Sequence, residues 1–181
     1  MIRSISEASF RETLAHFATG VTIVTAHGVE GPVGFTATGF TSLSLAPPLI
    51  LVCVAKNASA YGGVVGAERF GVSVLAEHQR WIAEQFARSG IDRFRDVPVV
   101  AEPSATVPLI EGAIARLECH YHAQHDAGDH TILIGRVAYA STGAGQPLLH
   151  FCRRFGGFVD DEVPREAVPS RASKLRGGGT A

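Results

Sequence analysis

The segment Leu49-Ile50-Leu51-Val52-Cys53-Val54-Ala55 is the longest apolar run of the 181-residue chain, and it decides the fold class. It has the length of a β-strand and is far shorter than the roughly 20 residues of a membrane span. An uninterrupted apolar strand is typical of a sheet that is covered on both sides, so we expect both faces of this strand to be buried. The turn residues Ala46-Pro47-Pro48 precede it and set its beginning.

Further β-rich segments lie on both sides of this run, separated by glycines, prolines and polar turns. The other expected strands are residues 21–25, 33–40, 69–75, 113–123 and 131–140. Short helices are expected at residues 6–18, 59–67 and 77–88, and a long loop at 88–106. Gly34 and Gly39 interrupt the second strand and indicate bulges or close backbone approaches.

The residue pattern of two of these segments also predicts where a helix ends and which face of a strand is buried. The first helix carries an apolar stripe of Phe10, Leu14 and Phe17 and is expected to end at Gly20. Residues 113–123 alternate, which predicts a half-exposed strand. The alternation places Cys119 and Tyr121 on its buried face and the polar residues Arg116, Glu118, His120 and His122 on its exposed face.

Six or seven strands joined by antiparallel hairpins predict a mainly β fold, a closed or partly open barrel with short helices plugging its ends. A Rossmann fold is disfavoured because no Gly-x-Gly-x-x-Gly opens a helix and the strands do not alternate with helices. The barrel is expected to fill residues 1–159 as one domain. Residues 160–181 contain Gly177-Gly178-Gly179 and few apolar residues, which predicts a flexible C-terminal tail.

Charge and cysteine usage exclude several classes of protein. A net charge of −1 argues against nucleic-acid binding, which needs a basic surface. The N-terminus lacks the apolar core of a secretory signal, and the three widely spaced cysteines predict no disulfide framework. We therefore expect a cytoplasmic protein that does not associate with membranes.

Four histidines cluster at His120, His122, His125 and His130. Histidines two apart on a strand share a face and could chelate a metal, but no cysteine or carboxylate spacing completes a site. We expect no metal, and a histidine-linked metalloprotein stays as a third-ranked alternative.

Three stretches carry side chains suited to ligand binding. Residues 34–44 are rich in Gly, Ser and Thr and could approach a heteroaromatic ring, although such residues also occur in ordinary barrel strands. Residues 55–60 combine Lys56 and Ser59 at a helix start, which suits a phosphate or an ordinary helix cap. Gly128-Asp129-His130 and Arg153-Arg154-Phe155 suggest neighbouring loops that hold an anionic cofactor, although the first is also common turn chemistry.

Three segments in this order resemble the short-chain flavin reductases of two-component flavin-dependent monooxygenases. They are Phe17 to Thr25, the run from Gly34 through Pro47-Pro48 to Ser59, and Gly128-Asp129-His130 together with Pro147-Leu148-Leu149. The resemblance covers roughly residues 8–158. It implies an FMN-binding split barrel of Greek-key type, usually a homodimer, with flavin sites near the subunit interface.

The resemblance also implies cofactor-binding residues. Residues facing the isoalloxazine would be Gly34, Phe35, Thr36, Ala37, Thr38, Phe40 and Thr41. Residues along the ribityl-phosphate path would be Cys53, Val54, Ala55, Lys56, Ser59 and Ala60, closed by Gln85 and Phe86. His130 matches the histidine associated with nicotinamide binding, and Arg153, Arg154 and Phe155 match a loop near both cofactors. Family members often have Tyr at the position of Phe155, so a hydroxyl there is lost.

The implied reaction is hydride transfer from the nicotinamide of NADH or NADPH to FMN or FAD, with reduced flavin passed to a monooxygenase. It needs no nucleophile and no general base, and none stands out in the sequence. A non-catalytic flavin- or tetrapyrrole-binding split barrel is the second reading. An oxidase of the pyridoxine phosphate type shares the fold but fits the quoted segments less well.

Overall fold

The computed structural model describes residues 5–100 and 106–159 of the chain. The expected tail at residues 160–181 lies outside the described residues, as do Met1 to Ser4. The helices are α1 (Glu7–Ala15), α2 (Tyr61–Val65), the 3-10 helix η1 (Glu77–Gln79) and α3 (Arg80–Phe86). The strands are β1 (Thr19–Gly20), β2 (Thr22–Gly28), β3 (Gly31–Ala37), β4 (Phe40–Leu45), β5 (Pro48–Ala55), β6 (Arg69–Val74), β7 (Ala115–Ala127), β8 (His130–Thr142), β9 (Leu149–Phe151) and β10 (Arg154–Gly156).

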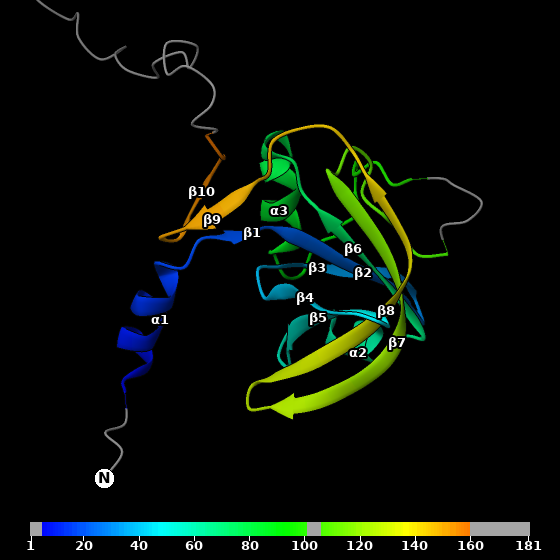
Figure 1. Cartoon of the computed structure of the whole chain (residues 1–181), viewed down its shortest axis with the longest axis horizontal. Helices are drawn as coiled ribbons and strands as arrows, with labels where there is room; N and C mark the ends of the chain where they lie inside the picture. The colour runs from blue at the N-terminus through cyan, green and yellow to red at the C-terminus, as the bar shows by residue number, and fades with distance from the viewer. Residues whose placement is uncertain (1–4, 101–105, 160–181) are drawn as a thin grey trace, which may run out of the picture.

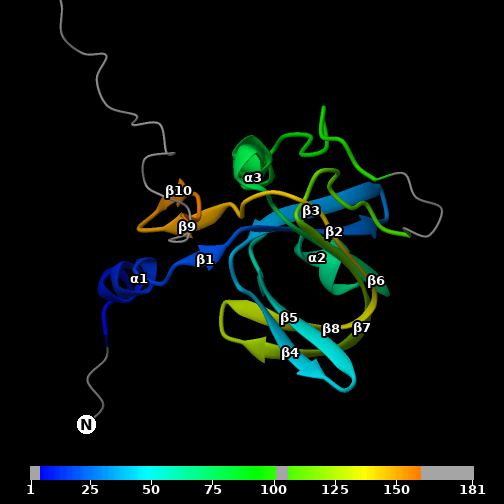
Figure 2. The ribbon, with the colours of Figure 1, turned by 45° about the horizontal axis from the view of Figure 1, so that its top comes forward.

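Seven strands form one antiparallel sheet in the order β3-β2-β6-β7-β8-β5-β4. The two edge strands, β3 and β4, follow each other in the chain and are joined by only Thr38 and Gly39. The sheet must therefore curl until its edges approach each other, as Figures 1 and 2 show. Within the described residues β3 and β4 each have one sheet neighbour, so the barrel is split between them. The predicted mainly β, six- to seven-stranded antiparallel split barrel is confirmed. The single strand expected at 33–40 instead ends at Ala37. Thr38 and Gly39 then cross from one edge of the sheet to the other.

Two apolar clusters cover the two sides of β2. Val24 and Ala26 belong to the cluster inside the barrel, where α2 packs, whereas Ile23 packs beneath α3. Residues 22–26 are all buried. The expectation that residues 49–55 are buried on both faces is wrong. In β5 only alternate residues such as Val52 are fully buried, because nothing in the described chain fully covers the opposite face.

Helix α1 differs from its prediction in length and environment. Ser6 caps it by accepting a hydrogen bond from the Ser9 amide, but it ends at Ala15 rather than near Gly20. No residue of α1 is buried, so its apolar stripe faces solvent. The helix leads into a second small sheet, β1-β9-β10, which projects from the barrel (Figure 1). The Val21 amide, which follows β1, donates to the Leu148 carbonyl, and Phe155 of β10 packs against the apolar cluster beneath α3.

The β7–β8 hairpin is present as predicted, but Glu118 is not on an exposed face. A bulge between Glu118 and Cys119 turns both residues inward. Glu118 accepts hydrogen bonds from Arg69 Nη1 (3.0 Å), the Thr106 amide (3.0 Å) and the Thr106 hydroxyl (2.5 Å). Tyr121, predicted to be buried, is exposed because a second bulge follows it.

No helix in the described residues combines the length and apolarity that crossing a bilayer requires. No three histidine, cysteine, aspartate or glutamate side chains in residues 5–100 and 106–159 gather into a group able to hold a metal ion.

Candidate functional site

The predicted ligand-binding stretch 34–44 crosses between the two edge strands and contacts β5 there. The Cys53 amide donates to the carbonyl of Gly39 at 2.8 Å, which ties the β3–β4 crossing to β5. A Cβ on Gly39 would lie 3.0 Å from the Cβ of Cys53, so the close approach expected at Gly39 is present. Thr38 and Thr41 are exposed beside this contact. An edge strand also offers backbone donors and acceptors that no neighbouring strand uses.

A cavity of about 190 Å³ opens next to the other end of this stretch. Its lining combines the predicted residues Gly34, Ser59 and Ala60 with the loop from Gly90 to Phe94. Gly34 allows a close packing there, because a Cβ at this position would lie 2.8 Å from Cε1 of Phe86. Phe86 in turn packs edge-on against Phe94, with ring centroids 4.9 Å apart.

Arg93 is the cation of this cavity. Its side chain donates from Nη1 to the carbonyl of Gly34 at 2.8 Å and from Nε to the carbonyl of Arg88 at 2.7 Å. Both hydrogen bonds that it makes within the described residues thus go to backbone carbonyls and not to a carboxylate. Burial lowers the pKa of Arg93 from its usual value, although a guanidinium stays charged at neutral pH. A half-buried cation without a carboxylate partner suits an anionic ligand.

Gln85 holds the loop that carries Arg93. Its side-chain amide donates to the carbonyl of Arg93 at 2.9 Å and to the carbonyl of Arg95 at 2.8 Å. Helix α3 itself is tied to β3, since the Thr36 hydroxyl donates to the Ala83 carbonyl at 2.6 Å. The sequence suggested Gln85 as a cofactor residue, and in the structure its amide nitrogen positions the cavity wall.

Several predicted site residues have side chains in the core and can offer only backbone to a ligand. These are Phe35, Ala37, Val54, Ala60 and Phe86. Ser59 does not cap α2, whose first turn receives no side-chain hydrogen bond, so the interpretation of this stretch as an ordinary cap is wrong. Its exposed hydroxyl lies at the cavity instead.

Lys56 and the hairpin turn that carries His130 lie next to each other where β5 ends. His130 is the register partner of Ala55 across the β5–β8 pairing. Its Nδ1 lies 2.7 Å from Oδ1 of Asp129, and this hydrogen bond lowers the pKa of Asp129. The ammonium of Lys56 contacts Asp126 and the carbonyl of Gly128 in the same hairpin turn.

Arg153, Arg154 and Phe155 lie on a different part of the chain. They belong to the β9–β10 hairpin, which Figure 1 shows well separated from the tip of the β7–β8 hairpin. The expectation that these residues and His130 occupy neighbouring loops is therefore wrong within one chain. The ring of Phe155 lies under the Arg80 guanidinium, 5.5 Å from centroid to Cζ, and lines a separate cavity of about 610 Å³.

The sequence interpretation missed the segment from Gly90 to Phe94, which it assigned to a plain loop. Its only signals were a glycine, which here has a φ of +75°, and the acid-base-aromatic triplet Asp92-Arg93-Phe94. Neither signal identifies a ligand site without the Gln85 hydrogen bonds that fold the loop back onto Gly34.

The edge strand β3 thus lines a cavity whose guanidinium has no carboxylate partner among the described residues, an arrangement that suits a ligand with a flat ring and an anionic group. The family model of the Flavin reductase like domain matches residues 14–158, and the chain belongs to this family. The family resemblance of the sequence is thereby confirmed.

Individual relatives agree with this assignment. The FMN reductase (NADH) SmoA of Agrobacterium fabrum is 43% identical over 150 residues, 83% of this chain and 85% of that protein. The 4-nitrophenol 4-monooxygenase/4-nitrocatechol 2-monooxygenase reductase component of Rhodococcus opacus is 36% identical, covering 88% of this chain and 85% of that protein.

The fold matches solved structures over most of its length. The NADH:FAD oxidoreductase SgcE6 of Streptomyces globisporus, solved in complex with NAD and FAD fragments, has a TM-score of 0.82 at 39% identity. That match covers 89% of this chain and 98% of the other. BorF, the flavin reductase component of a bacterial two-component tryptophan halogenase, has a TM-score of 0.79 at 39% identity, covering 86% and 99%.

Proposed function

We propose that this chain is an NAD(P)H-dependent flavin reductase that uses FMN or FAD and delivers reduced flavin to a partner monooxygenase. One observation carries the proposal: residues 53–60 contact all three features, since Cys53 binds the Gly39 carbonyl, Ala55 pairs with His130 and Ser59 lines the Arg93 cavity. Its relatives are named as NADH-dependent flavin reductases and as reductase components of monooxygenases.

The residues at this end fit a flavin. Among the described residues, the Arg93 guanidinium has donors left after its two carbonyl contacts and the Ser59 hydroxyl at the same cavity has no partner, which suits the phosphate. The β3–β4 crossing presents Thr38, Gly39 and Thr41 with unpaired strand edges, which suits the carbonyl and amide edge of the ring. Within the described residues no side chain fills the role of a nucleophile or a base.

The bound flavin supplies the hydride acceptor and the reduced nicotinamide supplies the hydride. The protein's part is to hold both rings in contact and to stabilise the charge that develops on the acceptor. Backbone donors at 36–41 and the exposed Thr38 hydroxyl serve the second task, and Arg93 anchors the phosphate end. His130, opposite Ala55, is placed to orient the nicotinamide.

We propose that the active form is a homodimer. Phe17 in the segment after α1 and Leu45 at the edge of β4 are 70% and 94% exposed, and the outward face of β5 is only half-buried. A second copy that covers these surfaces would bury an interface of the kind that obligate dimers form.

The dimer is tested by light scattering coupled to size exclusion. Phe17→Asp should shift the protein to monomer, whereas Val29→Asp, at an isolated exposed apolar residue in the β2–β3 turn, should leave the dimer intact. A wild-type protein that is monomeric at micromolar concentration contradicts the proposal.

The three unpaired cysteines, Cys53, Cys119 and Cys152, support a reducing location such as the cytoplasm.

The activity is tested by following NADH and NADPH oxidation with and without added FMN, FAD and riboflavin. We expect flavin-dependent oxidation of at least one nicotinamide. A protein that keeps a yellow chromophore but oxidises neither nicotinamide would instead be a non-catalytic flavin-binding module. Supply of flavin to a partner is tested by whether an oxygenase from the same source turns over only when this protein is present.

A further inference from the structure

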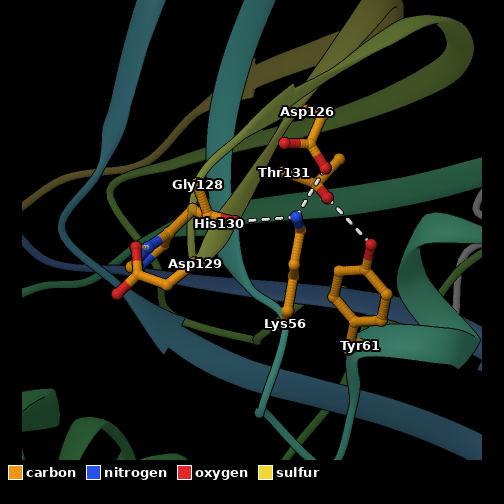
Figure 3. A network of polar contacts seen from close by, with 7 residues as sticks. All are labelled: Lys56, Tyr61, Asp126, Gly128, Asp129, His130 and Thr131. Atoms are coloured by element: carbon orange, nitrogen blue, oxygen red, sulfur yellow. Dashed lines mark hydrogen bonds and ion pairs between the residues drawn. The ribbon is translucent and has the colours of Figure 1, made fainter.

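The turn that carries His130 is held by one residue from a neighbouring strand end. The backbone amide of Lys56 donates to the Asp129 carbonyl at 2.9 Å, one step beyond the last strand pair. Its ammonium donates to Oδ2 of Asp126 at 2.5 Å and to the carbonyl of Gly128 at 2.7 Å (Figure 3). Lys56 therefore contacts three of the four residues from Asp126 to Asp129, in a tight turn whose Gly128 has a φ of +71°.

A second contact fixes the other side of His130. The hydroxyl of Tyr61, at the start of α2, lies 2.8 Å from the hydroxyl of Thr131, which is buried (Figure 3). The Asp129 carboxylate accepts from Nδ1 of His130, which leaves Nε2 for a ligand. His130 is thus flanked by anchored residues, and we call Lys56 and Tyr61 with their contacts the turn clamp.

The turn clamp belongs to the same short segment that lines the Arg93 cavity. Residues 55–61 fold into two consecutive tight turns, in which the Ala58 amide donates to Ala55 and the Tyr61 amide to Ala58. Ser59 and Ala60, between the two clamp residues, line the cavity, whereas Lys56 does not. The ammonium of Lys56 is engaged by the hairpin, and its pairing with Asp126 raises its pKa and lowers that of Asp126. Lys56 thus stays charged and bound to the turn across the neutral range.

We propose that Lys56 is a positioning residue for the nicotinamide, which fixes the His130 turn relative to the flavin cavity, and not a ligand of the flavin phosphate. The inference rests on the proposed function, because it assigns His130 to the nicotinamide. The two cations thereby have different roles, which the sequence alone does not distinguish. Arg93 discriminates flavins by their phosphate, and Lys56 affects the use of the hydride donor.

Steady-state kinetics of Lys56→Met and Lys56→Arg separate the two roles. Methionine keeps the length of the side chain and removes its charge, so we expect KM for the nicotinamide to rise about tenfold. The ratio of KM for FMN to KM for riboflavin should stay at the wild-type value, because only a phosphate ligand alters it. Arginine keeps a donor for Asp126 and should restore most of the nicotinamide KM. Arg136→Met, which removes an exposed charge from the same strand as His130, should change neither quantity.

Hydrogen exchange provides a measurement that does not depend on activity. Lys56→Met should raise exchange in a peptide covering 124–132 and leave a peptide covering 88–97 unchanged. Asp126→Asn keeps the Gly128 contact and should raise exchange and KM for the nicotinamide by a smaller factor. If Lys56→Met does not fold, Asp126→Asn provides the test of the proposal.

Each alternative outcome is distinct. If Lys56→Met abolishes the preference for FMN over riboflavin, Lys56 is a phosphate ligand and the proposal is overturned. If exchange in 124–132 and the nicotinamide KM both stay at wild-type values, the turn needs no clamp and the proposal is also overturned. If the wild-type protein oxidises no nicotinamide while the exchange difference is present, the clamp stands as structure and the proposed function fails.

Discussion

Replacing Gly34 by alanine tests whether the cavity depends on a glycine in β3. The added Cβ would lie 2.8 Å from Cε1 of Phe86, 2.9 Å from the Val24 carbonyl and 3.1 Å from Cγ2 of Thr25. The first two distances are shorter than a Cβ atom shows in folded proteins. Because the Val24 carbonyl belongs to a paired strand, Phe86 must move. Overpacking of this kind costs about 1–3 kcal/mol in the free energy of unfolding. For a chain of this size that corresponds to a fall in Tm of roughly 2–12 °C.

The functional effect follows from what touches Gly34. Phe86 packs against Phe94, and the Gly34 carbonyl accepts the Arg93 hydrogen bond, so displacement disturbs the phosphate end of the cavity. We expect FMN to bind about tenfold more weakly. Thermal unfolding and a fluorescence titration with FMN, at one fixed protein concentration, measure both effects.

Gly62→Ala is the matched control. Gly62 lies in α2 with nothing within 4 Å of its added Cβ. Alanine there should stabilise the protein by about 0.5–1 kcal/mol, because it lowers the backbone entropy lost on folding. Opposite signs for the two substitutions support the packing argument. If Gly34→Ala keeps the wild-type Tm and FMN affinity, the cavity does not depend on this contact and the reasoning is refuted.

Three further predictions follow from single residues. Arg93→Met should weaken FMN binding about tenfold or more while riboflavin binding changes little, and an equal loss for both flavins would argue against a phosphate contact. His130→Ala should raise KM for the nicotinamide more than the dissociation constant for flavin, and equal losses in both would contradict its assignment. For Glu118, burial raises the pKa, but the hydrogen bonds from Thr106 and Arg69 outweigh it and hold the pKa below its ordinary value. Its stabilising effect is therefore present above the ordinary pKa of about 4.5 and is lost as pH falls through the lowered one, so Glu118→Gln should lower Tm at pH 7 and flatten its decline in acid.

The sequence predicts strands well where local patterns decide them. The β-branched run at 21–25 and the segment expected from 131 as a hairpin partner both form strands at the expected places. It fails where a long-range contact decides. The bulge that buries Glu118 depends on Arg69 and Thr106, which are 49 and 12 residues away, and alternation carries no trace of it.

The same limit applies to the candidate site. The close backbone approaches predicted at Gly34 and Gly39 are confirmed, because a Cβ there would crowd Phe86 and Cys53, whereas ligand binding by 34–44 stays a prediction. The Gly90–Phe94 loop could not be found this way, since its fold depends on the hydrogen bonds of Gln85 and on a carbonyl of β3. The role of Lys56 was also ambiguous, because a lysine after a strand looks the same whether it binds a phosphate or a turn.

The unpaired seam between β3 and β4 has a consequence for turnover. A closed barrel widens only by breaking hydrogen bonds between strands, whereas this one can open at the seam with its described strand ladders intact. Only Thr38 and Gly39 connect the two edges, and a bulge at Leu43 already relaxes the pairing of β4 with β5. Under the function proposed above, a flat ring would enter and leave by a small outward displacement of β4, without local unfolding. Reduced flavin would then pass to a second protein with no loss of native stability.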